Sequence, residues 1–112
     1  MTLRQKQSCF AYHVGRLLLK AYSMGYEITL GEASRPKITA EYYAKMGIGI
    51  PNSLHISRLA IDLNLFIEGK YQRGSKGHDK LGEWWKKQHE LARWGGDFGD
   101  PNHYSFAHNG KA

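Results

Sequence analysis

The sequence predicts an α+β fold in which a small, mostly antiparallel sheet is flanked by helices. Two segments carry apolar residues at helical spacing, one near the start of the chain and one in its second half. Between them, residues 59–66 alternate apolar and polar side chains in the manner of a strand. The connections are short and rich in turn residues, so we expect a single domain spanning residues 1–112.

The first half of the chain predicts a helix, a strand and a second short helix. Residues 5–24 form the helix, because the following apolar residues recur on one side: Phe10, Val14, Leu17, Leu18 and Ala21. Gly25 ends it, and residues 26–30 alternate with β-branched content as a strand. Pro36 cannot donate to a ladder, so the chain should leave the sheet before a short helix over residues 40–46.

The second half begins with the clearest strand of the sequence, residues 59–66. One face takes Leu59, Ile61, Leu63 and Leu65, and the other takes Ala60, Asp62, Asn64 and Phe66. A polar, glycine-rich connection over 67–78 then leads to a helix over 79–93, whose apolar residues share one side. A turn-rich loop over 94–103 precedes a last short strand at 104–107.

Length and composition indicate a small globular protein. The chain has 112 residues, 41% of them hydrophobic and 23% charged, which excludes a disordered chain. No stretch approaches the roughly 20 apolar residues of a membrane span, and no apolar region typical of a signal peptide follows the basic start. The single cysteine, Cys9, excludes an internal disulfide. We expect a monomer made in the cytoplasm.

The chain is basic, with a formal net charge of +6. Such a charge favours an anionic partner, which can be a nucleic acid, a membrane surface or an acidic cell-wall polymer. The basic residues are scattered along the sequence rather than gathered in one block. Charge alone therefore does not choose among these partners.

Asp62 stands in the middle of the most apolar predicted strand. Its face can be open to solvent, as in a half-covered antiparallel sheet, and Asn64 on the same face favours that interpretation. If the face is covered, the carboxylate needs a partner. His55 lies seven residues earlier, an odd spacing that points the two side chains to opposite faces of a regular strand. A bend near residues 57–58 would bring them together.

His103 adds a third candidate ligand at the end of the turn-rich loop. Two imidazoles and one carboxylate, His55, His103 and Asp62, make a three-ligand zinc set that leaves one position open for water. Zinc lowers the pKa of such a water to about 7. Asp100, three residues before His103, is the candidate for proton transfer, and Arg35 can stabilise negative charge on a carbonyl oxygen.

The candidate ligands lie within two short sequence motifs that resemble those of a known enzyme family. The run from Ser53 through His55 to Asp62 resembles the Ser-x-His-x6-Asp signature of the D-alanyl-D-alanine carboxypeptidase and L-alanyl-D-glutamate endopeptidase family of zinc peptidases. Asp100-Pro-Asn-His-Tyr104 resembles the second motif of that family, and Glu-Ala-Ser-Arg35 its substrate-facing arginine segment. The Trp-Gly-Gly-Asp-Phe approach to the second motif is similar to phage endolysins. The resemblance runs from the first helix to Tyr104.

The resemblance implies a fold shared with lysostaphin-like and hedgehog domains. It implies one zinc ion, held by the two histidines and Asp62, with Asp100 as general base and acid. It also implies that Arg35 stabilises the oxyanion or holds a substrate carboxylate. Ser53 and Tyr104 would lie next to the ligands or contact substrate.

Two further residues are expected near the site. Arg58 stands where relatives commonly carry glycine, so it would narrow the cleft or meet a substrate carboxylate. His108, five residues after His103, is a candidate for a position beside the ligands or the substrate. The linker between Arg35 and His55 is short, so the substrate range can be altered or the activity lost.

Three functions remain open. The first is a hydrolase of peptidoglycan stem peptides, either an L-Ala–D-Glu endopeptidase or a D-Ala–D-Ala carboxypeptidase, acting in cell-wall degradation. Without a signal peptide, it fits a bacteriophage or prophage endolysin that reaches the wall during lysis. The second is an inactive zinc domain that binds cell-wall peptides or a protein. The third is a basic nucleic-acid-binding protein, which leaves the spacing of the ligand set unexplained.

Overall fold

The computed structural model of the protein describes residues 1–33 and 54–112. The short helix expected at 40–46, the candidate oxyanion residue Arg35 and the motif residue Ser53 lie outside these described residues. Every other candidate site residue lies within them.

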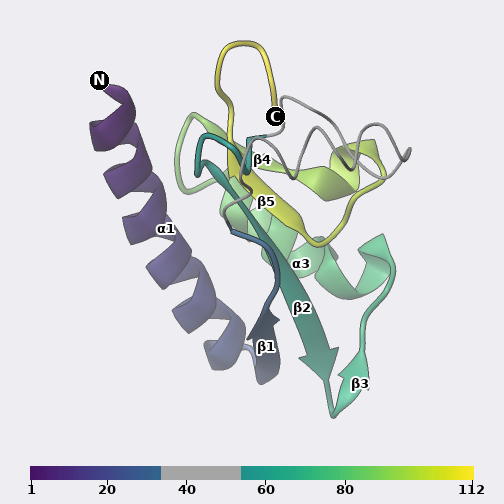
Figure 1. Cartoon of the computed structure of the whole chain (residues 1–112). Helices are drawn as coiled ribbons and strands as arrows, with labels where there is room; N and C mark the ends of the chain where they lie inside the picture. Colours follow the sequence, from purple (N-terminus) through teal and green to yellow (C-terminus); the bar gives the residue numbers. More distant parts are fainter. Residues whose placement is uncertain (34–53) are drawn as a thin grey trace.

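The described residues form two α-helices and a five-stranded antiparallel sheet (Figure 1). Their order along the chain is α1 (Leu3–Ser23), β1 (Tyr26–Leu30), β2 (Ala60–Ile67), β3 (Lys70–Tyr71), α3 (Ser75–Lys86), β4 (Ala92–Trp94), the 3-10 turn η1 (Gly95–Phe98) and β5 (His103–Phe106). The strands lie in the order β1-β2-β5-β4, and β3 pairs with β2. The predicted α+β class with a small antiparallel sheet is confirmed.

Helix α1 starts earlier than predicted because a capping box fixes its first turn. The Thr2 hydroxyl accepts from the Gln5 amide at 3.1 Å, and the Gln5 side chain accepts from the Thr2 amide at 2.8 Å. This reciprocal pair satisfies two amides that a helix start leaves without partners. The Thr-x-x-Gln spacing is visible in the sequence and marks the true boundary. At the other end, Gly25 has a φ of +82°, a conformation that glycine adopts without strain.

The predicted helix over 79–93 is wrong at both ends. Helix α3 runs over Ser75–Lys86, so it begins inside the expected loop and ends seven residues early. After it, the Ala92 amide donates to the His89 carbonyl at 3.1 Å, and the chain turns into strand β4. Ala92 and Trp94 are buried where β4 pairs with β5. Pairing and burial in this strand override the local helical pattern.

Strand β3 differs from the prediction, because the segment 67–78 that was expected to be a loop contains a tight hairpin between β2 and β3. Lys70 pairs with Ile67, which leaves a two-residue turn at Glu68 and Gly69. Both turn residues have positive φ, +52° and +77°, as a type I′ turn requires. Glu-Gly is a weaker signal for this turn than Asn-Gly or Asp-Gly, and it was missed.

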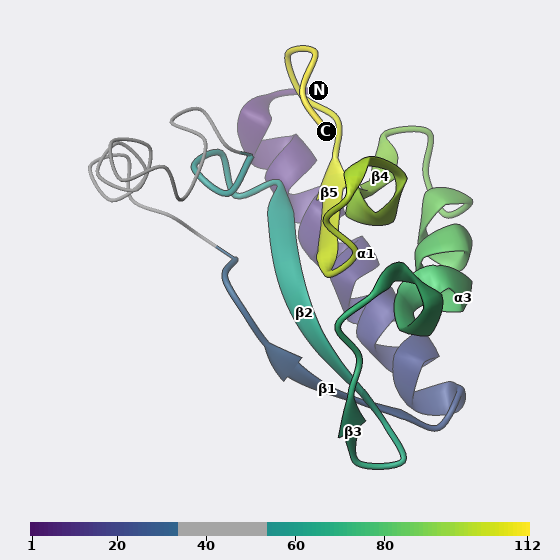
Figure 2. The same cartoon turned by 90° about the vertical axis from the view of Figure 1, so that its right-hand side faces the viewer.

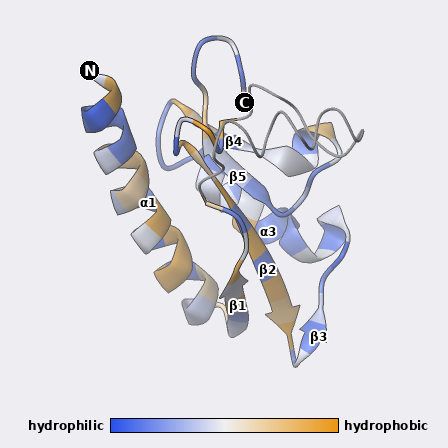
Figure 3. Cartoon of the chain, in the orientation of Figure 1, coloured by the Kyte–Doolittle hydropathy of each residue, from blue (hydrophilic) through white to orange (hydrophobic). Residues whose placement is uncertain are grey.

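The sheet has one face covered by helices and one face with polar side chains. Leu63 and Leu65 of β2 are fully buried, whereas the alternate residues Asp62 and Asn64 are only half-buried. Figure 2 shows α1 and α3 on the same side of the sheet, and Figure 3 shows β2 as predominantly hydrophobic. The residues of α1, α3 and β5 that form this core include Phe10, Leu17, Ala21, Leu81, Trp85, Tyr104 and Phe106. Polar groups on the other face are therefore available for chemistry.

A histidine is buried in the core beside β5. His78 is fully buried, and its Nδ1 lies 2.8 Å from the hydroxyl of Tyr104. Burial lowers the pKa of His78 from 6.5 to about 4, although a backbone contact with Gln72 opposes the shift. His78 is therefore neutral in the folded protein at physiological pH.

Because His78 is buried and neutral, we expect the folded protein to lose stability at acid pH. Between pH 6.5 and about 4 the unfolded chain binds a proton at His78 that the folded chain does not bind, so stability falls as the pH falls. The loss amounts to about 3 kcal/mol and levels off below pH ~4. Urea unfolding at several pH values should show this slope, and His78→Phe should flatten it. An unchanged slope in the variant would assign the acid sensitivity to other groups.

Among the described residues, no helix is both long enough and apolar enough to span a membrane.

Candidate metal centre

Strand pairing brings two of the three candidate ligands together. In the antiparallel pair β2–β5, Asp62 lies directly opposite His103. Directly opposed residues in such a pair have Cβ atoms about 5 Å apart and point to the same face. The two side chains therefore meet on the polar face of the sheet, opposite the helices. His103 is nevertheless buried, with 6% of its surface exposed.

The third candidate ligand reaches this face through a tight turn before β2. The Arg58 amide donates to the His55 carbonyl at 3.2 Å, and the Leu59 amide donates to the Leu54 carbonyl at 3.0 Å. Arg58 takes a φ of +57°, the left-handed region that lets the chain reverse here. The bend expected at residues 57–58 is thus confirmed, and the odd spacing between His55 and Asp62 is no obstacle.

The three side chains converge with spacings that suit a tetrahedral ion. Their candidate ligand atoms all lie within 4.8 Å of one another. Asp62 Oδ1 is 3.3 Å from Nε2 of His55 and 3.6 Å from Nδ1 of His103. Ligands bonded to zinc at about 2.0–2.1 Å in a tetrahedron are themselves about 3.4 Å apart. The donor set and its spacing therefore fit a zinc ion.

The electrostatics of Asp62 also fit a cation site. Burial alone would raise the pKa of Asp62, but the neighbouring rings of His103 and His55 outweigh it and lower the pKa to about 2. The carboxylate is therefore ionised at neutral pH. Its buried Oδ1 faces the two rings at 3.3 and 3.6 Å, and within the described residues neither contact has the geometry of a well-formed hydrogen bond. A bound cation would satisfy this oxygen.

A second carboxylate stands beside the cluster. Oδ2 of Asp100 lies 3.8 Å from Nδ1 of His103, and the Asp100 side chain is 55% exposed. Partial burial raises the pKa of Asp100; the charge of Asp62 adds to this rise, and the rings of His103 and His55 oppose it. Asp100 is thus close to the candidate ligands while remaining open to water, as a proton-transferring group needs to be.

Gly95 lets the chain place Asp100 and His103 together. The Asp100 amide donates to the Gly95 carbonyl at 2.8 Å, and the His103 amide donates to the Asp100 carbonyl at 3.1 Å. A Cβ added at Gly95 would collide with the Asp100 carbonyl oxygen and would lie 2.7 Å from Cβ of His103. Only glycine permits this close approach without a shift in the loop.

An aromatic residue that the sequence analysis did not select stands at the edge of the cluster. Phe98 packs edge-to-face on His103, with ring centroids 5.8 Å apart, and yet 52% of its surface is exposed. Phe98 therefore provides an exposed apolar edge beside the polar cluster. Its sequence signals were its place in a turn-rich loop and at the end of the Trp-Gly-Gly-Asp-Phe run, which resembles phage endolysins.

Two expected site residues lie away from the cluster. Tyr104 follows His103 but points to the opposite face, where it is fully buried against His78. Tyr104 therefore lies on the core side of β5, and its expected role beside the ligands or the substrate stays a prediction. His108 lies near the start of α1, with its Nδ1 3.0 Å from Nζ of Lys6. Partial burial and the charges of Lys6 and Lys111 lower the pKa of His108.

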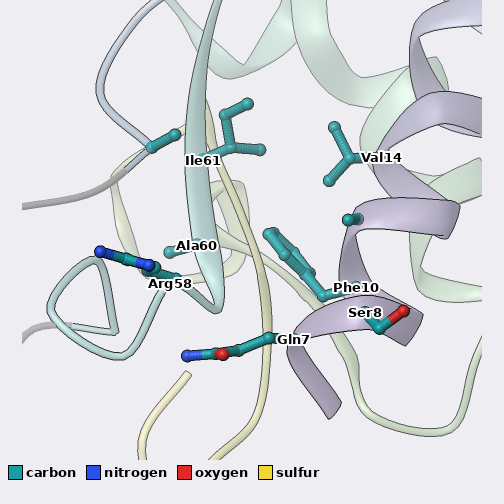
Figure 4. Close-up of a pocket in the computed structure, with 9 residues that line it drawn as sticks. Gln7, Ser8, Phe10, Val14, Arg58, Ala60 and Ile61 are labelled. Atoms are coloured by element: carbon teal, nitrogen blue, oxygen red, sulfur yellow. The ribbon is translucent and has the colours of Figure 1, made fainter. Parts of the chain in front are cut away.

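Arg58 is exposed and lines a pocket between α1 and the start of β2 (Figure 4). The pocket has a mostly apolar lining that includes Phe10 and Val14 from the helix and Ile61 from the strand. It contains none of the three candidate ligands. The backbone of Arg58 thus forms the bend next to the metal centre, while its side chain lines the separate pocket between α1 and β2.

Comparison with known proteins supports the fold. No protein-family model and no curated protein matches the sequence. Among solved structures, the chain is similar to the L-Ala D-Glu endopeptidase ChiX of Serratia marcescens, with a TM-score of 0.62 and 15% sequence identity. The match covers 71% of this chain and 66% of the ChiX chain, just under two thirds of it. At this identity the similarity establishes a shared α+β fold.

Proposed function

We propose that this chain is a single-domain zinc peptidase that hydrolyses peptidoglycan stem peptides. The observation that carries the proposal is the convergence of His55, Asp62 and His103 on one face of the sheet, with Asp100 beside them. Three ligands leave a fourth position open, which is typical of catalytic rather than structural zinc sites. The fold similarity to an L-Ala D-Glu endopeptidase supports the same substrate class.

The proposed chemistry divides among the residues of the cluster. The metal, when bound, supplies Lewis-acid activation of a water molecule and of the scissile carbonyl group. Asp62, ionised through its low pKa, contributes the negative charge that holds a divalent cation. Asp100 takes the proton from the attacking water and hands it to the leaving amine. The exposed ring of Phe98 offers an apolar surface for an alanyl methyl group.

Two residues complete the proposal from their sequence positions. Arg35 is the candidate cation for the negative charge that develops on the carbonyl oxygen, and Ser53 is the candidate for a contact with the ligands or the substrate. We further propose that the enzyme acts on the cell wall during phage or prophage lysis. Its net charge of +6 would help it hold anionic wall polymers.

A digest of purified peptidoglycan tests the activity and the metal together. We expect the zinc-loaded protein to release new amine termini, a chelator to abolish the release, and added zinc to restore it. Mass spectrometry of the fragments identifies the bond. A new amino group on D-Glu indicates an endopeptidase, and free D-alanine indicates a carboxypeptidase.

The same digest separates the proposal from its nearest alternative. One equivalent of bound zinc without cleavage of any stem peptide would indicate a domain that binds wall peptides or a protein. A chain that binds no zinc would remove the metal centre itself from consideration.

A further inference from the structure

Trp94, outside the metal cluster, packs closely against two glycines, Gly82 and Gly96. It ends β4, and only 4% of its surface is exposed. A Cβ added at Gly82 in α3, or at Gly96 in η1, would collide with the indole ring. The ring is therefore closely packed between α3 and the loop that precedes His103.

The indole N–H of Trp94 is directed into the loop that carries Asp100 and His103. Nε1 donates to the carbonyl oxygen of Pro101 at 2.7 Å. Pro101 lies between Asp100 and His103, whose own backbone bond spans the same turn at 3.1 Å. A core side chain is thus hydrogen-bonded to the middle of the turn that carries Asp100 and His103.

The turn is also attached to the sheet, because the Leu63 amide of β2 donates to the Asn102 carbonyl at 2.9 Å. The Asp100 amide bonds to the Gly95 carbonyl, and the Asp97 carboxylate pairs with Lys86 of α3 at 3.0 Å. That ion pair is exposed, and such pairs contribute about 0–1 kcal/mol. The partly buried bond from Trp94 is the attachment that a core side chain makes to this turn, and loss of the indole N–H would leave the Pro101 carbonyl without this partner.

We infer that Trp94 is a positioning residue, which sets the distance between Asp100 and the metal centre through its bond to Pro101. This inference rests on the proposed peptidase function. Removing the N–H would let the turn shift without removing any ligand. Partners of this indirect kind typically change activity by about 10–100-fold. A shift of about 1 Å in a proton-transferring group is enough for such a loss.

Trp94→Phe tests the inference against a matched control. The other buried indole of this core, Trp85, donates to the carbonyl oxygens of Arg93 and Ser105, at 2.9 and 3.3 Å, rather than to the catalytic turn. Trp85→Phe therefore removes an indole N–H from the same core and leaves the bond to Pro101 in place. We expect similar losses of stability from both variants. Only Trp94→Phe should lower kcat by about tenfold or more, with KM within about twofold.

A measurement independent of activity accompanies the kinetics. Hydrogen exchange of the Asp100 and His103 amides should accelerate in Trp94→Phe and stay unchanged in Trp85→Phe. Equal kcat losses in the two variants, or unchanged exchange at Asp100 and His103, would overturn the positioning role. If Trp94→Phe does not fold, benzothienylalanine at position 94 removes the N–H while keeping the shape of the ring. An inactive wild-type protein would instead count against the proposed function, and the exchange result would still be informative.

Discussion

Asp62→Ala is expected to abolish zinc binding and peptidase activity together. Asp62 is the only carboxylate of the proposed ligand set, and it is the ligand that lies between the two imidazoles. Its removal leaves two imidazole donors and no carboxylate charge to balance a divalent cation. Loss of partners outside the ligand shell costs about 10–100-fold in metal affinity, so loss of a ligand should exceed that range. Competition with a chelating dye measures the affinity.

Asn64→Ala is the matched control for this variant. Asn64 lies two residues further along β2, on the same face, and is also half-buried. Its removal changes a polar side chain of the same strand without touching the cluster. We expect zinc affinity and turnover close to those of the wild type. Zinc binding that survives in Asp62→Ala, with turnover intact, would show that the metal is held elsewhere.

The strand that carries Asp62 was predictable from its sequence, but its neighbour was not. Strict alternation over residues 59–66 predicts a half-covered strand, and β2 has that pattern of burial. Alternation says nothing about which strand pairs with it or in which register. The pairing of Asp62 with His103 is a tertiary contact between residues 41 positions apart. The residue types suggested the three candidate ligands. The register of the β2–β5 pair explains why Asp62 and His103 lie side by side.

The region before His103 shows why strand β4 and the contacts of the following loop were not predictable from the sequence. Residues 79–93 carry apolar side chains at helical spacing, although the last of them belong to β4. The strand forms because β5 offers it a partner, which no local window reveals. Gly95 was predicted to lie in a turn-rich loop, but no local pattern shows that its missing side chain permits the close approach of Asp100 and His103. Residue type and spacing therefore predicted the fold class and the candidate ligands, but not the strand pairing and loop contacts that bring the ligands together.

Asp100→Asn should separate catalysis from metal binding. The amide keeps the size of the side chain but cannot accept a proton from water, so kcat should fall by about 10²–10⁴-fold. Zinc affinity should stay close to that of the wild type, because Asp100 is not one of the three converging ligands. Single-turnover hydrolysis of a stem peptide, with zinc content measured on the same sample, gives both quantities.

Asp97→Asn is the control that makes this result specific to position. Asp97 belongs to the same loop, and its side chain is 53% exposed against 55% for Asp100. It pairs with Lys86 on the side of α3, so the same chemical change there should leave kcat nearly unchanged. Equal losses in both variants would attribute the effect to the loop's general charge. A loss confined to Asp100→Asn, with zinc still bound, would instead mark a catalytic centre, because a site that only holds a metal has no use for a proton acceptor 3.8 Å from His103.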